Sequence, residues 1–322
     1  MKTIQMPYAE LARALGVKDV YLKREDQHKY GSHKGRSIPL MLKKYFKEDG
    51  KTDFVISSSG NAALAAIHAV QAHNRNNPSK LRLTVFVGQN IDPKKIKLLL
   101  ITVEDANIKI EQVERPKQSA FQMDKDGTAK ILRQSTDDSA LLGYLELAEE
   151  LDKIPNLAAI FIPTSSGTTA QGLGEAFWTD NYLKLSAKGG SASGGKNGPQ
   201  IHIVQTTSCH PIAEAFNASS PGVYPERSRR EGGDRGGVRS LASAIVDHVA
   251  MRKEKVIEII KTSNGSGWIV SDKEIVEAIN LTKETCNLAI SANSALSVAG
   301  LKKAALSGWQ WNGPVVCLVT GM

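Results

Sequence analysis

The sequence predicts an α/β protein whose parallel β-sheets are covered by helices on both faces. Short, nearly all-apolar segments of strand length alternate along the chain with longer segments that have the apolar periodicity of a helix. Strands that are apolar throughout are typical of parallel sheets, because both of their faces are buried. We therefore expect twisted parallel sheets in a three-layer αβα arrangement.

The alternation can be followed from one end of the sequence to the other. Strands are expected at residues 20–23, 53–57, 83–87, 108–113, 158–163, 201–205, 267–270 and 315–319. Helices are expected at residues 5–15, 33–47, 62–72, 93–100, 138–151, 170–178, 242–249, 272–282 and 293–306. Ser271 and Glu274 have the spacing of a capping box. Two stretches rich in glycine, serine and charged residues, 186–199 and 219–240, are interpreted as solvated loop insertions.

The composition excludes several classes of protein. Hydrophobic residues make up 41% and charged residues 23% of the 322 residues, as in ordinary globular proteins. No apolar run is long enough to span a membrane, and residues 1–7 lack the core of a signal peptide. The three cysteines are too few and too scattered for a disulfide framework or a metal site. We therefore expect a cytoplasmic protein that binds neither membrane nor metal.

The net charge of +8 raises the alternative of a nucleic-acid-binding protein. Five arginines lie between residues 226 and 240, but three acidic residues lie among them and no aromatic residue is present there to stack on bases. A net positive charge equally favours the binding of anionic small molecules. We do not expect nucleic acid as a partner.

Lys34 lies where the strand at 20–23 is expected to lead into a helix. Ser32 is placed to cap that helix, and Pro39 suits its first turn. The positive end of a helix dipole and nearby cations disfavour an ammonium group, so the amine of Lys34 could act as a nucleophile that forms Schiff bases. The alternative is an exposed lysine in a glycine-containing loop.

A loop with hydroxyl side chains follows the strand at 53–57. Residues 58–61 read Ser-Ser-Gly-Asn and lead into an alanine-rich helix. Ligands of α/β proteins bind at the carboxyl ends of parallel strands, and hydroxyl groups beside a helix N-terminus suit a carboxylate or a phosphate. The alternative is simple capping of the helix by Ser59 or Asn61.

Residues 165–169 (Ser-Ser-Gly-Thr-Thr) repeat this arrangement after the strand at 158–163. Such a loop presents N–H donors to a phosphate. It lacks the lysine of a nucleoside-triphosphate loop and the three glycines of a dinucleotide fingerprint, so ordinary nucleotide binding is disfavoured. Thr320 would bring one more hydroxyl to the same edge of the sheet, although taken alone it is interpreted as a strand-terminal residue.

The order of these motifs resembles that of the tryptophan synthase β-like family, the fold-type II pyridoxal-phosphate-dependent enzymes. Residues 23–26 (Lys-Arg-Glu-Asp) and 31–36 (Gly-Ser-His-Lys-Gly-Arg) are similar to the lysine motif of the threonine and serine dehydratases. Residues 58–63 and 316–321 are more similar to threonine synthase. The resemblance covers essentially the whole chain except the two insertions.

The resemblance implies a role for each motif, with pyridoxal 5′-phosphate as the cofactor. Lys34 would hold the cofactor as a Schiff base and remove the substrate α-proton, and Ser59 would donate a proton on the opposite face. Asn61 would contact the ring hydroxyl of the cofactor, and Thr320 its pyridine nitrogen. The substrate carboxylate would be held by Ser58, Ser59, Gly60, Asn61 and Ala62. The cofactor phosphate would be held by Ser165, Ser166, Gly167, Thr168 and Thr169.

The resemblance also implies two domains. Residues 1–42 and 138–322 would form a large cofactor-binding domain, and residues 43–137 a small mobile domain that closes on the substrate carboxylate. Two departures from the family pattern leave the substrate open. His33 replaces the usual phenylalanine or isoleucine before the lysine, and residues 291–294 read Ser-Ala-Asn-Ser where Glu-Pro-Ser is common. A third departure, at residues 6–8, is of little consequence.

The expected function is that of a pyridoxal-phosphate-dependent lyase. A neutral hydroxyl at Thr320 cannot hold a proton on the pyridine nitrogen, which disfavours transamination and favours loss of a β-substituent. We expect β-elimination, or elimination with replacement, on a hydroxy or O-substituted amino acid, as in threonine or serine dehydratase. Threonine synthase acting on O-phosphohomoserine and a catalytically silent homologue that binds the cofactor are the alternatives. Relatives in the family are commonly dimers, so a homodimer is one expected state.

Overall fold

The computed structural model describes residues 2–179, 198–219 and 240–321. These residues divide into two compact units: unit 1 contains residues 25–146 and Gly321, and unit 2 contains residues 2–24 and 147–320. Most of both expected insertions, including the arginines between 227 and 239, lies outside the described residues. In the described part of the chain, no helix has the length and apolar character needed to cross a membrane.

Unit 2 is built on a six-stranded sheet with the order β1-β2-β10-β7-β8-β9. Its strands are β1 (Gln5–Pro7), β2 (Val20–Arg24), β7 (Ala159–Pro163), β8 (Gln200–Thr206), β9 (Gly267–Val270) and β10 (Val315–Val319). Only the β1–β2 pair is antiparallel among these strands. Strand β10 therefore lies inside the sheet, between β2 and β7, with both of its neighbours parallel to it.

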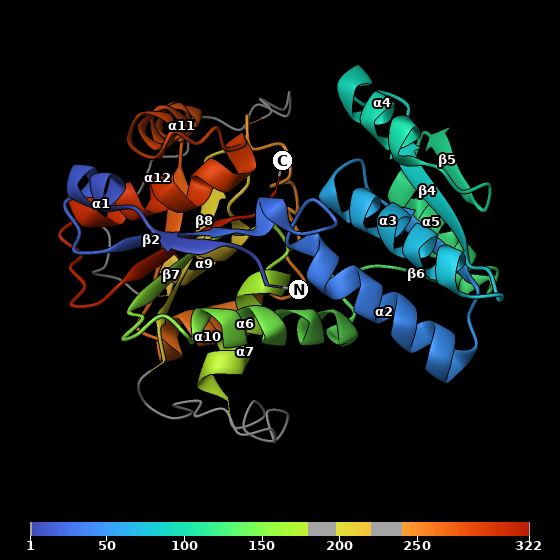
Figure 1. Cartoon of the computed structure of the whole chain (residues 1–322), viewed down its shortest axis with the longest axis horizontal. Helices are drawn as coiled ribbons and strands as arrows, with labels where there is room; N and C mark the ends of the chain where they lie inside the picture. Colours follow the sequence, from blue (N-terminus) through green and yellow to red (C-terminus); the bar gives the residue numbers. More distant parts are fainter. Residues whose placement is uncertain (1, 180–197, 220–239, 322) are drawn as a thin grey trace. The chain divides into compact units, whose positions relative to one another are not determined.

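Helices cover both faces of this sheet (Figure 1). They are α1 (Ala9–Leu15), α7 (Thr168–Trp178), α9 (Pro211–Ala218), α10 (Lys253–Thr262), α11 (Asp272–Cys286) and α12 (Ala292–Leu306), and α6 (Leu145–Leu151) runs across the boundary between the units. Helices α1, α11 and α12 share one hydrophobic core with the strands, to which Phe161 and Cys317 contribute. Helix α10 packs against α7 and α9, all three helices pack against β8, and α9 also packs against β9. The expected capping box at the start of α11 is confirmed.

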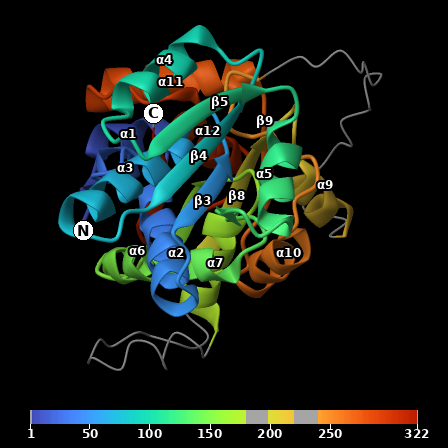
Figure 2. The same ribbon diagram turned by 90° about the vertical axis from the view of Figure 1, so that its right-hand side faces the viewer.

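Unit 1 contains a four-stranded parallel sheet with the order β5-β4-β3-β6 (Figure 2). Its strands are β3 (Asp53–Ser57), β4 (Arg82–Gly88), β5 (Ile108–Val113) and β6 (Lys130–Ile131). Its helices are α2 (Lys34–Asp49), α3 (Asn61–Asn76), α4 (Pro93–Thr102) and α5 (Pro116–Lys125), with the 3-10 helices η1 (Glu25–Gln27) and η2 (Asp138–Tyr144). Phe54 and Ile56 of β3 pack with α2, α3 and α4, whereas Val55 packs with Ala120 of α5.

Several local expectations about helices are wrong. Residues 5–7 form an edge strand because they pair with β2, and a helix begins only at Ala9. Residues 138–144 form a 3-10 helix before α6, and the side chain of Asp137 accepts a hydrogen bond from the N–H of Ser139. Pro39 lies inside α2, beyond its first turn. Segment 242–249 is not helical, for a reason given with the site below.

Five short elements were not foreseen in the sequence: η1, β6, α5, α9 and α10. The compact units also differ from the expected domain bounds. A boundary between residues 42 and 43 would divide α2, which packs as one helix against α3 and η2 within unit 1. Its apolar residues, Ile38, Met41 and Leu42, share the core of that unit with β3 and β4.

Candidate functional site

Lys34 is the first residue of α2, at the positive end of the helix dipole, as the sequence predicts. His33 occupies the N-cap position, and the Ser32 hydroxyl accepts a hydrogen bond from the N–H of Lys34 at 3.3 Å. The Lys34 side chain is half-buried, and its amine makes no hydrogen bond or ion pair with any other described residue. An unengaged amine at a fixed position is what a covalent link to a cofactor requires.

The first turn of α2 is held in place by buried charges that the sequence analysis did not identify. The guanidinium of Arg36 makes two hydrogen bonds to the carboxylate of Glu25, at 2.7 and 2.8 Å, and both side chains are fully buried. Arg36 also reaches Glu146 at 3.3 Å. Buried charges are tolerated only when they are paired and hydrogen-bonded. This network therefore fixes the helix turn that carries Lys34.

Lys23 is a second lysine close in sequence, in unit 2, but its amine is already engaged. It is fully buried, forms an ion pair with Glu150, and donates to the backbone oxygen of Thr3 at 3.0 Å and to the side chain of Gln5 at 3.1 Å. A lysine held in this way serves the structure of unit 2, so Lys34 remains the candidate for cofactor attachment.

The Ser-Ser-Gly-Asn loop lies in unit 1 at the carboxyl end of β3, as expected. The Ser58 hydroxyl accepts a hydrogen bond from the N–H of Gly60 at 3.3 Å. Gly60 occupies the N-cap position of α3, Asn61 and Ala62 begin the helix, and no side chain caps it among the described residues. Capping by Ser59 or Asn61, the alternative interpretation of this motif, is therefore not observed. The half-buried loop keeps a helix N-terminus suited to a carboxylate.

Gly321 brings three of the sequence motifs together within unit 1. It forms an isolated antiparallel bridge with Ser32, two residues before Lys34. A β-carbon at Gly321 would lie 2.6 Å from Nδ2 of Asn61 and 2.6 Å from Cβ of Ser32, so only glycine fits here. The lysine motif, the serine loop and the end of the chain described here therefore meet at this residue, and Thr320 directly precedes it.

The Ser-Ser-Gly-Thr-Thr loop lies in unit 2, between β7 and α7. Gly167 occupies the N-cap position of α7 with a positive φ of 92°, and a β-carbon there would lie 2.8 Å from a methyl group of Val256. The hydroxyls of Ser166 and Thr168 lie 3.0 Å apart. Because β7 and β10 are parallel neighbours, this loop and Thr320 follow the same edge of the sheet. The arrangement fits a phosphate.

Ser165 differs from the rest of the loop, because its hydroxyl is fully used within the protein. It accepts hydrogen bonds from the N–H groups of Val246 and Asp247, at 3.2 and 3.3 Å, and donates to the carboxylate of Asp247 at 3.3 Å. A serine hydroxyl has one proton and two lone pairs, so these bonds saturate it. They also explain why 242–249 is not helical: N–H groups of this segment bond to Ser165 instead of to helical carbonyls.

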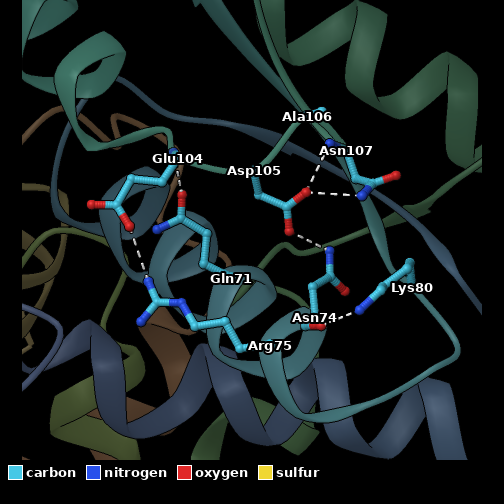
Figure 3. Close-up of a pocket in the computed structure, with 8 residues that line it drawn as sticks. All are labelled: Gln71, Asn74, Arg75, Lys80, Glu104, Asp105, Ala106 and Asn107. Atoms are coloured by element: carbon cyan, nitrogen blue, oxygen red, sulfur yellow. Dashed lines mark hydrogen bonds and ion pairs between the residues drawn. The ribbon is translucent and has the colours of Figure 1, made fainter.

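A cavity of about 290 Å³ in unit 1 lies away from all of these motifs. Figure 3 shows that its charged and polar side chains face one another. Arg75 pairs with Glu104 at 3.1 Å, and the amide of Asn74 donates to the carboxylate of Asp105 at 2.6 Å. It lies beside the residues that precede β4 and β5, whereas ligands of parallel sheets bind at the carboxyl ends of the strands. We therefore assign it a structural role.

Comparisons with known proteins agree with this geometry. Residues 2–321 match the family described as pyridoxal-phosphate dependent enzymes. Two curated relatives are threonine synthases, from Methanosarcina acetivorans and Methanocaldococcus jannaschii. Each is 23% identical, over 321 and 325 residues respectively, and each match covers 97% of this chain and 72% of the relative.

Solved structures show the same fold at low sequence identity. Threonine deaminase isoform 2 from Solanum lycopersicum has a TM-score of 0.75 at 16% identity, covering 100% of this chain and 84% of that one. Maize serine racemase has a TM-score of 0.74 at 15% identity, covering 100% of this chain and 88% of that one.

The fold and the motifs define a pyridoxal-phosphate-dependent enzyme of fold type II, as the sequence predicts. This chain belongs to the pyridoxal-phosphate-dependent enzyme family, and pyridoxal phosphate is its cofactor. Two features of the structure fit this group: the unengaged amine of Lys34, and the glycine-containing N-terminus of α7.

Proposed function

We propose that the chain catalyses loss of the β-substituent from a hydroxy or O-substituted amino acid, in the manner of a threonine or serine dehydratase. The observation that supports this reaction type is Thr320, which follows β10 and directly precedes Gly321. The Thr320 hydroxyl would face the pyridine nitrogen of bound pyridoxal phosphate, and because it is neutral it would limit electron withdrawal into the ring. Reactions in which a leaving group departs at once are then favoured over transamination.

Each residue of the candidate site has a task in this proposal. Pyridoxal phosphate, bound through Lys34, supplies the electron withdrawal that acidifies the substrate α-proton. The amine of Lys34 would accept that proton as a general base. Ser58 and the N–H groups at the start of α3 bind the substrate carboxylate, and Ser59 donates a proton to the departing hydroxyl group.

The phosphate of the cofactor is assigned to the start of α7. Gly167, Thr168 and Thr169 provide backbone N–H groups, and Ser166 provides a hydroxyl. Asn61 is assigned to the ring hydroxyl, an interaction supported by its place beside Gly321. Substrate binding at the serine loop would exclude water from the reacting atoms.

Threonine synthesis from O-phosphohomoserine is the second candidate function. It is favoured by two curated relatives that are named threonine synthases. The similarity of residues 58–63 and 316–321 to threonine synthase supports it as well.

Assays of the purified protein with pyridoxal phosphate separate these functions. We expect equal amounts of 2-oxo acid and ammonia from threonine or serine, and loss of at least about a thousandfold of this activity in Lys34→Ala. Lys43→Ala is the matched control, because Lys43 is exposed on the same helix, and it should retain activity. The visible absorption band of the bound cofactor should disappear in Lys34→Ala and persist in Lys43→Ala.

Other outcomes would redirect the assignment. Threonine formed from O-phosphohomoserine, without deamination of threonine or serine, would establish the second candidate. Interconversion of enantiomers without elimination, the activity named for the maize neighbour, would contradict both. A cofactor band that no amino acid changes would identify a silent homologue.

A further inference from the structure

Tyr144 carries a buried polar group that the site described above does not use. Its side chain is fully buried at the end of η2, and its hydroxyl has no hydrogen-bond partner among the residues that the structure describes. A buried hydroxyl without a partner loses its hydrogen bonds to water and gains nothing in return, which is unfavourable for folding. Such groups are rare in folded proteins and require an explanation.

Tyr144 lies close in space to the start of α2, which carries Lys34. Its ring lies against the imidazole of His33, with ring centroids 6.4 Å apart and the planes inclined by 33°. His33 is buried and directly precedes Lys34 in the chain. Helix η2 packs against α2, and Arg36, in the first turn of α2, is ion-paired to Glu146, two residues after Tyr144. Tyr144 is therefore held against the residue that directly precedes Lys34 in the chain.

We propose that Tyr144 is a positioning residue for Lys34, and that its hydroxyl gains a hydrogen-bond partner when pyridoxal phosphate is bound there. This inference rests on the part of the proposed function in which Lys34 holds the cofactor. A group that is unsatisfied in the free protein and satisfied in the loaded protein favours loading, because binding removes an unfavourable interaction and adds a hydrogen bond. The position of His33, a departure from the family pattern, gives the tyrosine its neighbour.

The test compares two substitutions that each remove only a hydroxyl. Tyr144→Phe removes the unsatisfied group. Tyr45→Phe is the matched control, because the Tyr45 hydroxyl donates to the carboxylate of Asp137 at 2.5 Å in the same unit. For both variants and the wild type, the midpoint of thermal unfolding without cofactor and the dissociation constant of pyridoxal phosphate are measured, the latter by titrating the visible band.

The two variants should respond in opposite ways. Tyr144→Phe should unfold no earlier than wild type without cofactor and should bind pyridoxal phosphate about tenfold more weakly, the loss expected for one hydrogen bond. Tyr45→Phe should unfold earlier but bind the cofactor with unchanged affinity. A purely structural tyrosine would not lose affinity while retaining its stability in the free protein.

Two results would overturn the proposal. Unchanged affinity in Tyr144→Phe would mean that the hydroxyl takes no part in the loaded state. Lower stability of the free Tyr144→Phe protein would mean that the hydroxyl is already satisfied before binding. Lys34→Ala distinguishes a failure of the Lys34 assignment from a failure of the role of Tyr144. If Lys34→Ala keeps the cofactor band, the assignment of Lys34 fails. If it loses the band while Tyr144→Phe behaves as wild type, only the role of Tyr144 fails.

Discussion

His202 is buried among aromatic side chains of unit 2. Its ring stacks on Phe161 at a centroid distance of 4.5 Å, and Trp268 donates a hydrogen bond to its Nδ1 at 3.1 Å. Its Nε2 lies 3.2 Å from the side-chain oxygen of Gln200, which also accepts from Trp311 at 2.8 Å. With Nδ1 as acceptor and Nε2 as donor, the imidazole is neutral. Burial lowers its pKa from 6.5 to about 3.

This depressed pKa predicts a loss of stability in acid. Below pH 6.5 the unfolded chain binds a proton at His202 that the folded chain does not, so the free energy of unfolding falls as the pH decreases toward about 3. The contribution of this one group is about 1.4 kcal/mol per pH unit within that window. Urea unfolding of wild type and His202→Gln at several pH values checks this. The variant should show the shallower pH dependence, and equal slopes would contradict the prediction.

Single residues differ in how far the sequence predicts them. The places of Lys34 and Asn61 at the start of α2 and α3 were predicted because a local motif, strand then turn then helix, indicates them, whereas their roles stay predictions. His202 and Tyr144 were not, because the pKa of His202 depends on its burial and the unsatisfied hydroxyl of Tyr144 depends on the packing around it. Neither property is encoded in a local pattern.

Among the elements, the strands were predicted best. The expected bounds of β3, β5, β9 and β10 agree with the structure, because an apolar run flanked by polar or turn residues marks a buried strand. Segment 242–249 was predicted worst. Its apolar residues have helical spacing, but its N–H groups bond to distant side chains: Ala244 to Asn293 at 3.0 Å, and Val246 and Asp247 to Ser165. Such side-chain bonds compete with helix formation and are invisible in the local sequence.

This arrangement predicts that Ser165 anchors segment 242–249 more than it binds phosphate. Ser165→Ala removes the acceptor of the N–H groups of Val246 and Asp247 and should lower the free energy of unfolding by about 0.5–1.5 kcal/mol. Ser166→Ala is the matched variant in the same loop and should mainly weaken cofactor binding. Urea unfolding and cofactor titration measure both effects. Weaker binding in Ser165→Ala at unchanged stability would instead support the phosphate role that the family resemblance implies.

At the scale of the whole molecule, the order of the motifs along the chain predicted the family, which no single motif could do. The bounds of the compact units were less predictable, because they depend on which core each helix joins. Helix α2 follows a strand of unit 2 in sequence but buries Met41 in the core of unit 1.

Tryptophan fluorescence provides a probe for the effect of the cofactor on unit 2. All four tryptophans, at 178, 268, 309 and 311, belong to unit 2, so tryptophan fluorescence follows the unfolding of that unit. Pyridoxal phosphate at about a hundred times its dissociation constant should stabilise the wild type by about 2.7 kcal/mol. Lys34→Ala, a change in unit 1, should reduce this rise in the fluorescence-detected unfolding midpoint. An equal rise in both proteins would mean that unit 2 binds the cofactor without Lys34.

The position of β10 inside the six-stranded sheet has a consequence for folding during synthesis of the chain. Arg24 of β2 pairs with Val319 of β10, 295 residues later in the chain. At roughly 5–20 residues per second, a ribosome needs about 15–60 s to synthesise the intervening residues. For that time β2 has no partner on one edge, and an open strand edge is prone to pair with other chains. We expect the nascent chain to depend on a chaperone that covers this edge until β10 is synthesised.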